Sequence, residues 1–378
     1  MYSIEEICNN LSCWFEEQEY IGYDPYQLNR YRWIIAKRLQ KPKLATLFLQ
    51  KLIIPKALGL IIRGNVNLYL RSKKPDVLSQ NEKIIRILLN NSYNSGYQNS
   101  AWGWPFSWTS GFGLIYPEGY PLSVVTAEIG HAFLDHYEVK PSEELKAICG
   151  KVADALINEI GFTKINNEEI CFHYTNLDKY FVINTNTYVA SYLARLHSIQ
   201  PKKEYYDLSS RACKFTLTYQ QDDGSWYYYA PPFVQKNKTI DNRHTGFTIV
   251  ALQWANKFLK DKSINEAISK GWEFYRKNFV SDYKPKNSLN SIFPIDIHNV
   301  AQLIITATEC GDKKLAEGCA QWAIESMSNK KDEFYYQMYQ DGTIIKIPFF
   351  RWNQAWMYRA LTLFQERWEN EKSNGTKQ

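Results

Sequence analysis

Several features that would place a protein in a specialised class are lacking from this sequence of 378 residues. No apolar run approaches the roughly 18 residues that a membrane-spanning helix needs, so we expect no transmembrane segment. The N-terminal stretch MYSIEEICNN lacks a basic region followed by an apolar one, so we expect no secretory signal and a cytoplasmic location. The formal charge is only +6 and no dense Lys/Arg stripe occurs, which argues against a nucleic-acid partner.

Ordered cysteine spacing is also lacking. The seven cysteines are odd in number and irregularly spaced, with no C-x-x-C pair, so we expect reduced thiols and no disulfide framework. No H-E-x-x-H or paired Cys/His spacing is present, so we predict no metal and no cofactor. A phosphate-binding loop is excluded as well, because QQDDGSW is not followed by Lys-Ser/Thr.

Aromatic residues, by contrast, are abundant. They make up 15% of the chain, with 12 Trp and 27 Tyr. Such an excess is typical either of a large core or of a site that stacks on flat or ring-shaped ligands.

Apolar residues recur at helical spacing in six segments. Each segment is apolar or small nearly all round, which is typical of a helix that is buried on several faces. Their starts lie roughly 55 to 65 residues apart, the scale of one supersecondary unit per repeat. The segments are 56–70, 122–137, 184–199, 241–258, 296–310 and 352–368.

Six more polar segments alternate with these, each with charges on one face and apolar residues on the other. They are 26–40, 81–93, 142–160, 205–220, 263–279 and 314–328. The alternation predicts an all-α fold, an (α/α)6 toroid of six inner and six outer helices. A generic helical array or an open superhelix is the alternative. We expect one domain over residues 1–370 and a disordered tail over 371–378.

Long loops rich in Trp, Tyr, Phe and Gly precede the inner helices. They cover 96–121, 170–186, 220–244 and 333–354. We expect short hairpins in several of them, for example at the Asp-Gly turn of QDGT. In a toroid these loops gather at one mouth, where functional residues are held by a rigid frame.

Ionisable side chains cluster where two of the inner helices begin. The fourth begins with Asp241, Arg243 and His244, and the fifth begins with Asp296 and His298. The two aspartates and two histidines are the candidate catalytic residues. Asp241 and Asp296 are equally well placed as helix N-caps, an ordinary role that does not exclude catalysis.

The candidate substrate-binding residues lie in the same loops and helix starts. Tryptophans can stack on sugar rings, and polar side chains can bind hydroxyl groups. Arg243 and Arg351 fit a bidentate clamp for a carboxylate, although Arg351 could instead bind a carbonyl group, and the tryptophans could simply pack the loops. The set is Trp102, Trp104, Trp108, Asp178, Asn184, Trp226, Arg243, Arg351, Trp352 and Gln354.

The stretch FTLTYQQDDGSW resembles the Q-x3-G-x-W signature of α/α-toroid terpene cyclases. Gln220, Gly224 and Trp226 match it, and the resemblance implies a structural role for them. The D-x-D-D acid motif of those cyclases is absent. The resemblance therefore supports the fold and argues against cyclase chemistry.

The chain also resembles a bacterial family that is encoded with capsule and exopolysaccharide biosynthesis genes. The matching stretches run from about residue 57 to residue 365: WGWPFSW, YPLSVVTAEIGHAFLDHYE, CFHYTNLDK, DGSWYYY, IDNRHTGF, DIHNVAQ and RWNQAWM. This resemblance implies a role in surface polysaccharide biosynthesis. Toroids of six hairpins are also the frame of many glycosidases, polysaccharide lyases and uronyl C5-epimerases, which implies an oligo- or polysaccharide substrate.

The favoured interpretation is therefore a carbohydrate-active enzyme with an anionic substrate. In a uronate epimerase or lyase, a base such as His244 or His298 removes the proton next to a carboxylate, which Arg351 and Arg243 would hold. In a glycoside hydrolase, Asp241 and Asp296 would be the pair of carboxyl groups. A non-catalytic glycan-binding or assembly protein and an isoprenoid cyclase-like enzyme stay open.

Overall fold

A computed structural model describes residues 3–27, 47, 49–94, 96–98, 100–110, 112–233 and 238–374. The chain divides into two compact units. We name Ile87–Phe279 the middle unit, and Met1–Arg86 with Val280–Gln378 the terminal unit. The expectation of one domain over 1–370 stays a prediction.

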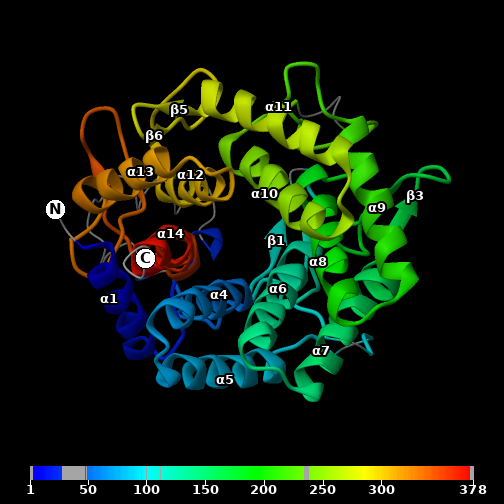
Figure 1. Ribbon diagram of the computed structural model, residues 1–378, viewed down its shortest axis with the longest axis horizontal. Coiled ribbons are helices and arrows are strands. Elements are labelled where there is room, and N and C mark those ends of the chain that lie inside the picture. Colours follow the sequence, from blue (N-terminus) through cyan, green and yellow to red (C-terminus); the bar gives the residue numbers. More distant parts are fainter. Residues whose placement is uncertain are drawn as a thin grey trace. The chain divides into compact units, whose positions relative to one another are not determined.

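The middle unit consists of two layers of helices (Figure 1). In the first layer, α8 (Ile183–Ile199) packs against both α6 (Ser123–Val139) and α10 (Asn242–Leu259). In the second layer, the helix that follows each of these three helices in the sequence packs against it. The backing helices are α7 (Glu143–Asp154) with its π-helical continuation η2 (Ala155–Ile160), α9 (Lys203–Thr218) and α11 (Lys262–Phe279).

The terminal unit is built around α14 (Trp356–Asn374), which the π-helix η4 (Phe350–Ala355) precedes. The main helices that pack on α14 are α4 (Pro55–Ser72), α12 (Ile297–Glu309) and α1 (Ile4–Glu17). α13 (Lys313–Ser326) covers α12, and the short 3-10 helix η1 spans Pro25–Gln27. The boundary between the units falls within α5 (Pro75–Asn90).

Burial separates the two kinds of helix as the sequence pattern predicts. Every residue of α8 from Ile183 to Leu196 is buried, whereas α9 buries only one face. All six predicted inner segments are helical, and 352–368 begins as η4 before it becomes α14. The all-α class is therefore confirmed.

The predicted boundaries were less accurate than the predicted segments. α5 begins at Pro75 rather than at residue 81. α1 lies outside the predicted segments, although Ser3 and Glu6 form the S-x-x-E pattern of a capping box, and Ser3 Oγ accepts a hydrogen bond from Glu6 N at 3.4 Å. Residues 28–40 of the helix predicted over 26–40 lie outside the described residues. So do residues 375–378 of the predicted tail.

Short antiparallel hairpins precede helix starts, as expected. In the middle unit, β1 (Trp108–Thr109) pairs with β2 (Ile115–Tyr116), and β3 (Phe162–Lys164) pairs with β4 (Ile170–Phe172). In the terminal unit, β5 (Val280–Ser281) pairs with β6 (Lys284–Pro285). There β8 (Gln337–Met338) also lies between β7 (Ile295–Asp296) and β9 (Ile344–Ile345), and the QDGT turn joins β8 to β9.

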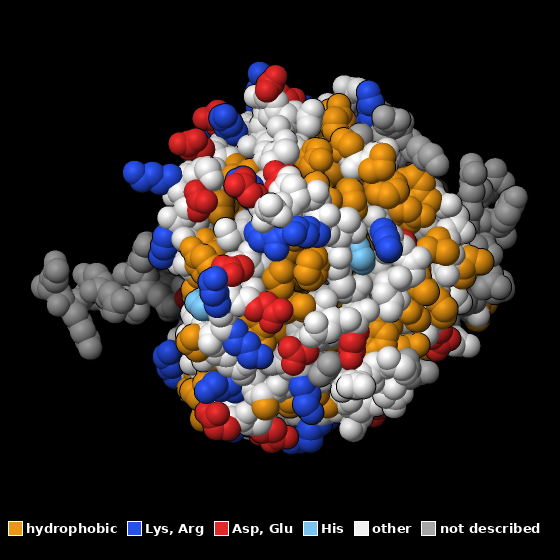
Figure 2. Space-filling model, turned by 90° about the vertical axis from the view of Figure 1, so that its right-hand side faces the viewer, with side chains coloured by type: hydrophobic (Ala, Val, Ile, Leu, Met, Phe, Trp, Pro, Cys, Tyr) orange, Lys and Arg blue, Asp and Glu red, His pale blue; other side chains and the backbone are white. Residues whose placement is uncertain are grey.

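The surface carries charges of both signs. Figure 2 shows the side on which α9 and β3 lie, where acidic and basic side chains are intermingled and no patch of one sign forms. Among the helices of the described ranges, none has the length and apolar character to cross a membrane.

Gln220, Gly224 and Trp226 form a structural joint between α9 and α11. Gln220 Nε2 donates hydrogen bonds to Gly224 O at 3.0 Å and to Ala267 O at 2.9 Å. Trp226 Nε1 donates to Thr216 O at 2.9 Å, and its ring leaves no room for a Cβ at Gly271. These contacts agree with the structural role that the Q-x3-G-x-W resemblance implies.

We expect Gly224→Ala to destabilise the protein far more than Gly342→Ala. Both glycines have a positive φ, +89° and +82°, so either alanine adopts a backbone conformation that costs about 1–2 kcal/mol. Only at Gly224 would the new Cβ also lie 2.3 Å from a backbone oxygen, that of Lys270. This overlap should add about 2 kcal/mol or more to the loss, which urea unfolding of both variants would measure. Equal losses would contradict the steric argument.

Candidate functional site

In the middle unit, the start of α10 borders a small recess. Its walls include Asn184, Trp226, Tyr228, Asp241 and His244. The cavity volume is about 10 Å³, which corresponds to roughly one water molecule. A larger ligand would therefore place one group in the recess and lie mostly outside it.

Hydrogen bonds between loops build the recess. Ile183 N, at the start of α8, donates to Tyr228 O at 3.1 Å, and Tyr228 N donates to Thr239 O at 2.9 Å. Ala230 N donates to Phe181 O at 2.9 Å, so the loops that precede α8 and α10 are tied together. Within the middle unit these loops gather at the N-terminal ends of the helices, as the sequence predicts.

Asp241 and His244 form a hydrogen-bonded pair at the edge of the recess. Asp241 Oδ1 caps α10 by accepting a hydrogen bond from His244 N at 3.0 Å, and Oδ2 lies 2.6 Å from His244 Nδ1. The His244 side chain is 32% exposed, and its ring lies 4.4 Å from the ring of Tyr228. Because Nδ1 is engaged by Asp241, Nε2 is the ring nitrogen that is left for proton exchange with a ligand.

Charge around Asp241 keeps its carboxylate ionised. Burial by itself would raise the pKa of Asp241, but the ion pair and hydrogen bonds with His244 and the charge of Arg243 outweigh it. The pKa of Asp241 is therefore held well below its usual range. A carboxylate that stays charged can orient an imidazole and stabilise its protonated form, but it is a poor proton donor.

Asn184 contributes an unsatisfied acceptor to the same recess. Its side chain is 5% exposed, and in the described part of the chain its Oδ1 accepts no hydrogen bond. Buried polar atoms without a partner are uncommon and costly, so this amide oxygen suits a water or a hydroxyl group of a ligand.

Asp178 is a second aspartate of the middle unit whose carboxyl group has a shifted pKa. It is 6% exposed and accepts a hydrogen bond from Tyr116 Oη at 2.5 Å and another from Tyr180 N at 3.1 Å. Burial raises the pKa of Asp178 to about 6, against the lowering effect of these two hydrogen bonds. Burial and the contact with Asp178 also raise the pKa of Tyr116.

The predicted platform of three tryptophans is corrected by the structure. Trp102 is 1% exposed, and its Nε1 donates to Leu88 O at 2.8 Å, so its ring belongs to the core. Trp104 is also buried and stacks on Phe106. Of the three, only Trp108 is half-buried, and its ring stacks on that of Tyr116 at 5.3 Å. Trp226 is buried too, as part of the joint between α9 and α11.

In the terminal unit, both carboxylate oxygens of Asp296 accept hydrogen bonds. Its Oδ1 accepts from His298 N at 2.9 Å and from Trp352 Nε1 at 2.8 Å. Its Oδ2 accepts from Gln337 Nε2 at 2.9 Å. Asp296 is 4% exposed, so its geometry is that of a buried structural cap.

His298 lies among aromatic rings. Its ring is 4.7 Å from that of Trp356 in a stacked arrangement and 4.6 Å from that of Trp352 in an edge-on one. His298 and Trp352 are each 5% exposed. The structure therefore brings Asp296, His298 and Trp352 together, but in a more enclosed setting than that of His244.

Two predicted ligand-binding side chains of the terminal unit have structural partners instead. Arg351 donates from Nε to Asp24 Oδ2 at 2.6 Å and from a terminal nitrogen to Asp24 Oδ1 at 2.9 Å, with both side chains buried. The bidentate geometry expected of Arg351 is thus present, but its carboxylate belongs to Asp24. Gln354 is fully buried and exchanges hydrogen bonds with the backbone of Phe334. Both assignments are corrected for this reason.

The candidates thus form one group in each unit. Asp241, His244, Asn184 and Trp226 border one recess in the middle unit, with Arg243 beside Asp241, whereas Asp296, His298 and Trp352 cluster in the terminal unit. Their convergence at one mouth stays a prediction. No group of three or more His, Cys, Asp or Glu residues in the described part of the chain is arranged to hold a metal ion.

The sequence analysis missed several partners of these residues. Tyr228, Tyr116 and Gln337 lie in the aromatic-rich loops that it singled out, but nothing in the loops ranks one Tyr or Gln above another. Asp24 precedes Pro25, and its partner Arg351 is 327 residues away. No local pattern signals a pair of this kind.

Comparisons with solved structures support the fold. The chain is similar to cellobiose 2-epimerase from Bacillus thermoamylovorans, with 12% identity and a TM-score of 0.64 over 83% of this chain and 87% of that chain. It is also similar to a glycoside hydrolase family 76 mannosidase from Bacteroides thetaiotaomicron, with 13% identity and a TM-score of 0.61 over 84% and 88% of the two chains. A polysaccharide lyase is 12% identical, with a TM-score of 0.64 over 97% of both chains.

No family model matches the sequence, and no curated protein matches it. At identities this low, the likeness to solved structures shows the fold alone. The fold belongs to the α/α-toroid class, as the alternating helices predicted.

Asp24→Asn should destabilise the protein by about 3–5 kcal/mol, because the buried guanidinium of Arg351 would lose its anionic partner. Glu143→Gln is the matched control. It breaks a 3.5 Å pair with Lys146 in which the Glu143 side chain is 87% exposed, and it should cost about 0.5 kcal/mol or less. Urea unfolding distinguishes the two. A small loss with Asp24→Asn would mean that Arg351 finds another partner or water.

We expect the carboxyl group of Asp178 to titrate near pH 6. Its pKa is raised from 3.8, so the folded state holds this proton more tightly than the unfolded one, and the contribution of Asp178 to stability falls as pH rises from about 4 to about 6. Tyr116→Phe removes a donor to the carboxylate and should raise the pKa further. Tyr120→Phe is the control, because the Tyr120 hydroxyl donates to Asn176 instead. Carboxyl ¹³C NMR titration measures the pKa values, and a downward shift with Tyr116→Phe would refute the assignment.

Proposed function

We propose that this protein is a carbohydrate-active enzyme in which His244 exchanges a proton with a sugar, while Asp241 orients the imidazole and stabilises the positive charge that forms on it. The observation that carries the proposal is the 2.6 Å contact between Asp241 Oδ2 and His244 Nδ1 at the edge of the recess. A histidine held by a carboxylate through one nitrogen is a common arrangement for a general base. The similar structures include a sugar epimerase, a mannosidase and a polysaccharide lyase, which supports a carbohydrate substrate.

The favoured reaction is epimerisation at C5 of a uronate residue, or elimination by a lyase. In both reactions the base removes the proton next to the carboxylate, and a cationic side chain stabilises the negative charge that develops. His244 Nε2 would take the proton. Arg243, which is half-buried beside Asp241, would face the carboxylate, and Asn184 Oδ1 would accept a hydrogen bond from a sugar hydroxyl group.

The low pKa of Asp241 separates this proposal from the hydrolase alternative. A glycoside hydrolase needs one carboxyl group that is protonated and able to donate to the leaving oxygen. Asp241 is held ionised by His244 and Arg243, and both oxygens of Asp296 already accept hydrogen bonds. Asp241 therefore lacks the environment of a general acid, so the Asp241 and Asp296 pair is the weaker candidate.

The wider role in this proposal is assembly of a bacterial surface polysaccharide. The anionic substrate would be a precursor or a nascent chain of that polysaccharide. This part rests on the resemblance to proteins encoded with capsule genes.

We expect the purified protein to incorporate deuterium at C5 of uronate-containing oligosaccharides in D₂O, as followed by proton NMR. His244→Ala should slow this exchange by about a hundredfold or more, because the proton acceptor is lost. Asp241→Asn should also slow it, because the imidazole loses its orienting carboxylate. His197→Ala is the matched control. His197 lies near the end of α8, and its Nδ1 is 2.9 Å from the backbone oxygen of Lys202, which does not line the recess, so this variant should react like the wild type.

The products distinguish the alternatives. Exchange without chain cleavage indicates an epimerase, and an unsaturated product indicates a lyase. New reducing ends without exchange would refute proton abstraction and favour hydrolysis. Exchange that is unaffected by His244→Ala would refute the role of His244. Binding without any reaction would favour a glycan-binding protein.

A further inference from the structure

A large groove in the terminal unit lies between α1 and the junction of α4 with α5. Its cavity volume is about 630 Å³, within the range of small-molecule sites, which is about 300–1,000 Å³. All the residues that line it belong to α1, α4 and α5 or to the turn between α4 and α5. We call it the α1 groove. It contains none of the candidate residues for carbohydrate chemistry.

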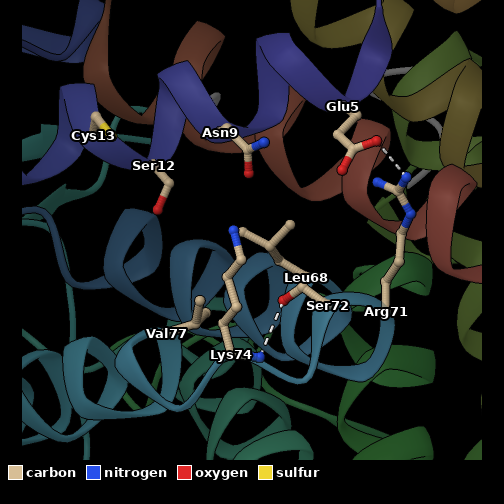
Figure 3. A pocket seen from close by; sticks show the side chains of 9 residues that line it. All are labelled: Glu5, Asn9, Ser12, Cys13, Leu68, Arg71, Ser72, Lys74 and Val77. Atoms are coloured by element: carbon tan, nitrogen blue, oxygen red, sulfur yellow. Dashed lines mark hydrogen bonds and ion pairs between the residues drawn. The ribbon is translucent and has the colours of Figure 1, made fainter.

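The wall formed by α1 is a polar stripe. Glu5, Asn9 and Ser12 lie at spacings of four and three residues, which places them on one face of the helix. The opposite stripe of α1, which includes Leu11 and Phe15, is buried. In the polar stripe, Glu5 and Asn9 are exposed, whereas Ser12 is buried and donates to Gln80 Oε1 at 3.4 Å. Figure 3 shows these side chains directed toward the groove.

The other wall supplies positive charge above an apolar floor. Arg71, near the end of α4, is paired with Glu5 at 2.6 Å. Lys74, in the turn between α4 and α5, extends toward α1 in Figure 3 with its amine on the side of Asn9. Within the described ranges no carboxylate forms an ion pair with Lys74. The groove therefore has one positive charge that Glu5 does not balance.

The lining also indicates which ligands the groove suits. It contains no aromatic side chain, although aromatic residues are 15% of the sequence, so it offers no surface for stacking on a sugar ring. It offers instead an ammonium group, an amide and hydroxyl groups over the apolar side chains of Leu68 and Val77. Lysine binds phosphates and carboxylates as a point charge, and the volume exceeds that of an inorganic ion.

We propose that the α1 groove binds a small organic anion, a phosphate monoester or a carboxylate, with Lys74 Nζ as its charge partner and Asn9 Nδ2 as a hydrogen-bond donor. The site is separate from the recess at Asp241 and His244, and its occupancy does not depend on the proposed function.

Isothermal titration calorimetry of the full chain tests the proposal, with glucose 6-phosphate, glucuronate and glucose as probes. Glucose 6-phosphate supplies a phosphate monoester and glucuronate supplies a carboxylate on a similar sugar ring. Glucose is the neutral control. We expect at least one anion to bind, more weakly as salt is added, and glucose not to bind. Lys74→Asn should weaken binding about tenfold or more, because the charged hydrogen bond is lost.

Lys73→Asn is the matched control variant. It removes the same charge from the neighbouring position, but Lys73 Nζ lies over the ring of Tyr69, 5.6 Å from its centre, and does not line the groove. Lys73 has a positive φ, which asparagine tolerates. This variant should bind the anion as the wild type does.

Cys13 provides a second readout that locates the ligand. It lines the groove and is exposed, whereas Cys310 is only partly exposed and the other five cysteines are buried. A bound anion should slow alkylation of Cys13 by iodoacetamide and leave Cys310 unaffected, as measured by peptide mass spectrometry. Equal losses of affinity in the two lysine variants would show a general charge effect and overturn the proposal. So would binding of glucose, unprotected Cys13, or no binding of either anion.

Discussion

Helices that are buried on several sides also bury the backbone groups at their ends, and this constraint organises both units. α8 is buried over nearly its whole length, and α12 is buried from Ile297 to Thr308. A backbone end that is buried in this way must find hydrogen-bond partners, so Asp, Asn and Gln side chains gather at the helix starts. The same Asp, Asn and Gln side chains are therefore available to form a ligand-binding or catalytic site.

Asp241 and Asp296 show how one capping role can lead to two outcomes. Each accepts the backbone N–H of a histidine in the first turn of its helix. The second oxygen of Asp241 meets the imidazole of His244, which is partly exposed. The second oxygen of Asp296 meets Gln337, and Trp352 donates to the first, so that carboxylate is enclosed by protein donors. Only the first arrangement leaves a proton-transfer group accessible.

Buried charges elsewhere in the chain fix the loops around these helix starts. Arg351 and Asp24 join the segment that follows α1 to η4, and Phe350 N donates to Tyr23 O at 2.9 Å beside them. Asp178 and Tyr116 join the loop after β4 to the β1–β2 hairpin. Removing a partner from such a pair leaves a polar group without water, which is why these contacts hold irregular loops in defined positions. We predicted from residue type that Arg351 and Asp178 contact a ligand. In the structure these two side chains instead bind Asp24 and Tyr116.

The sequence by itself determined the helical class, the positions of the buried helices and the capping role of residues such as Asp241, because periodicity and caps are local signals. The resemblance to the Q-x3-G-x-W signature implied a structural role for Gln220, Gly224 and Trp226, although Trp226 was also a candidate substrate-binding residue. Only the tertiary structure decided that Trp102 and Gln354 face the core and that Arg351 is neutralised by Asp24. It alone distinguished the accessible His244 from the enclosed His298. The physical reason is that burial and charge pairing depend on neighbours that are distant in sequence. Residue type and local spacing do not identify those neighbours.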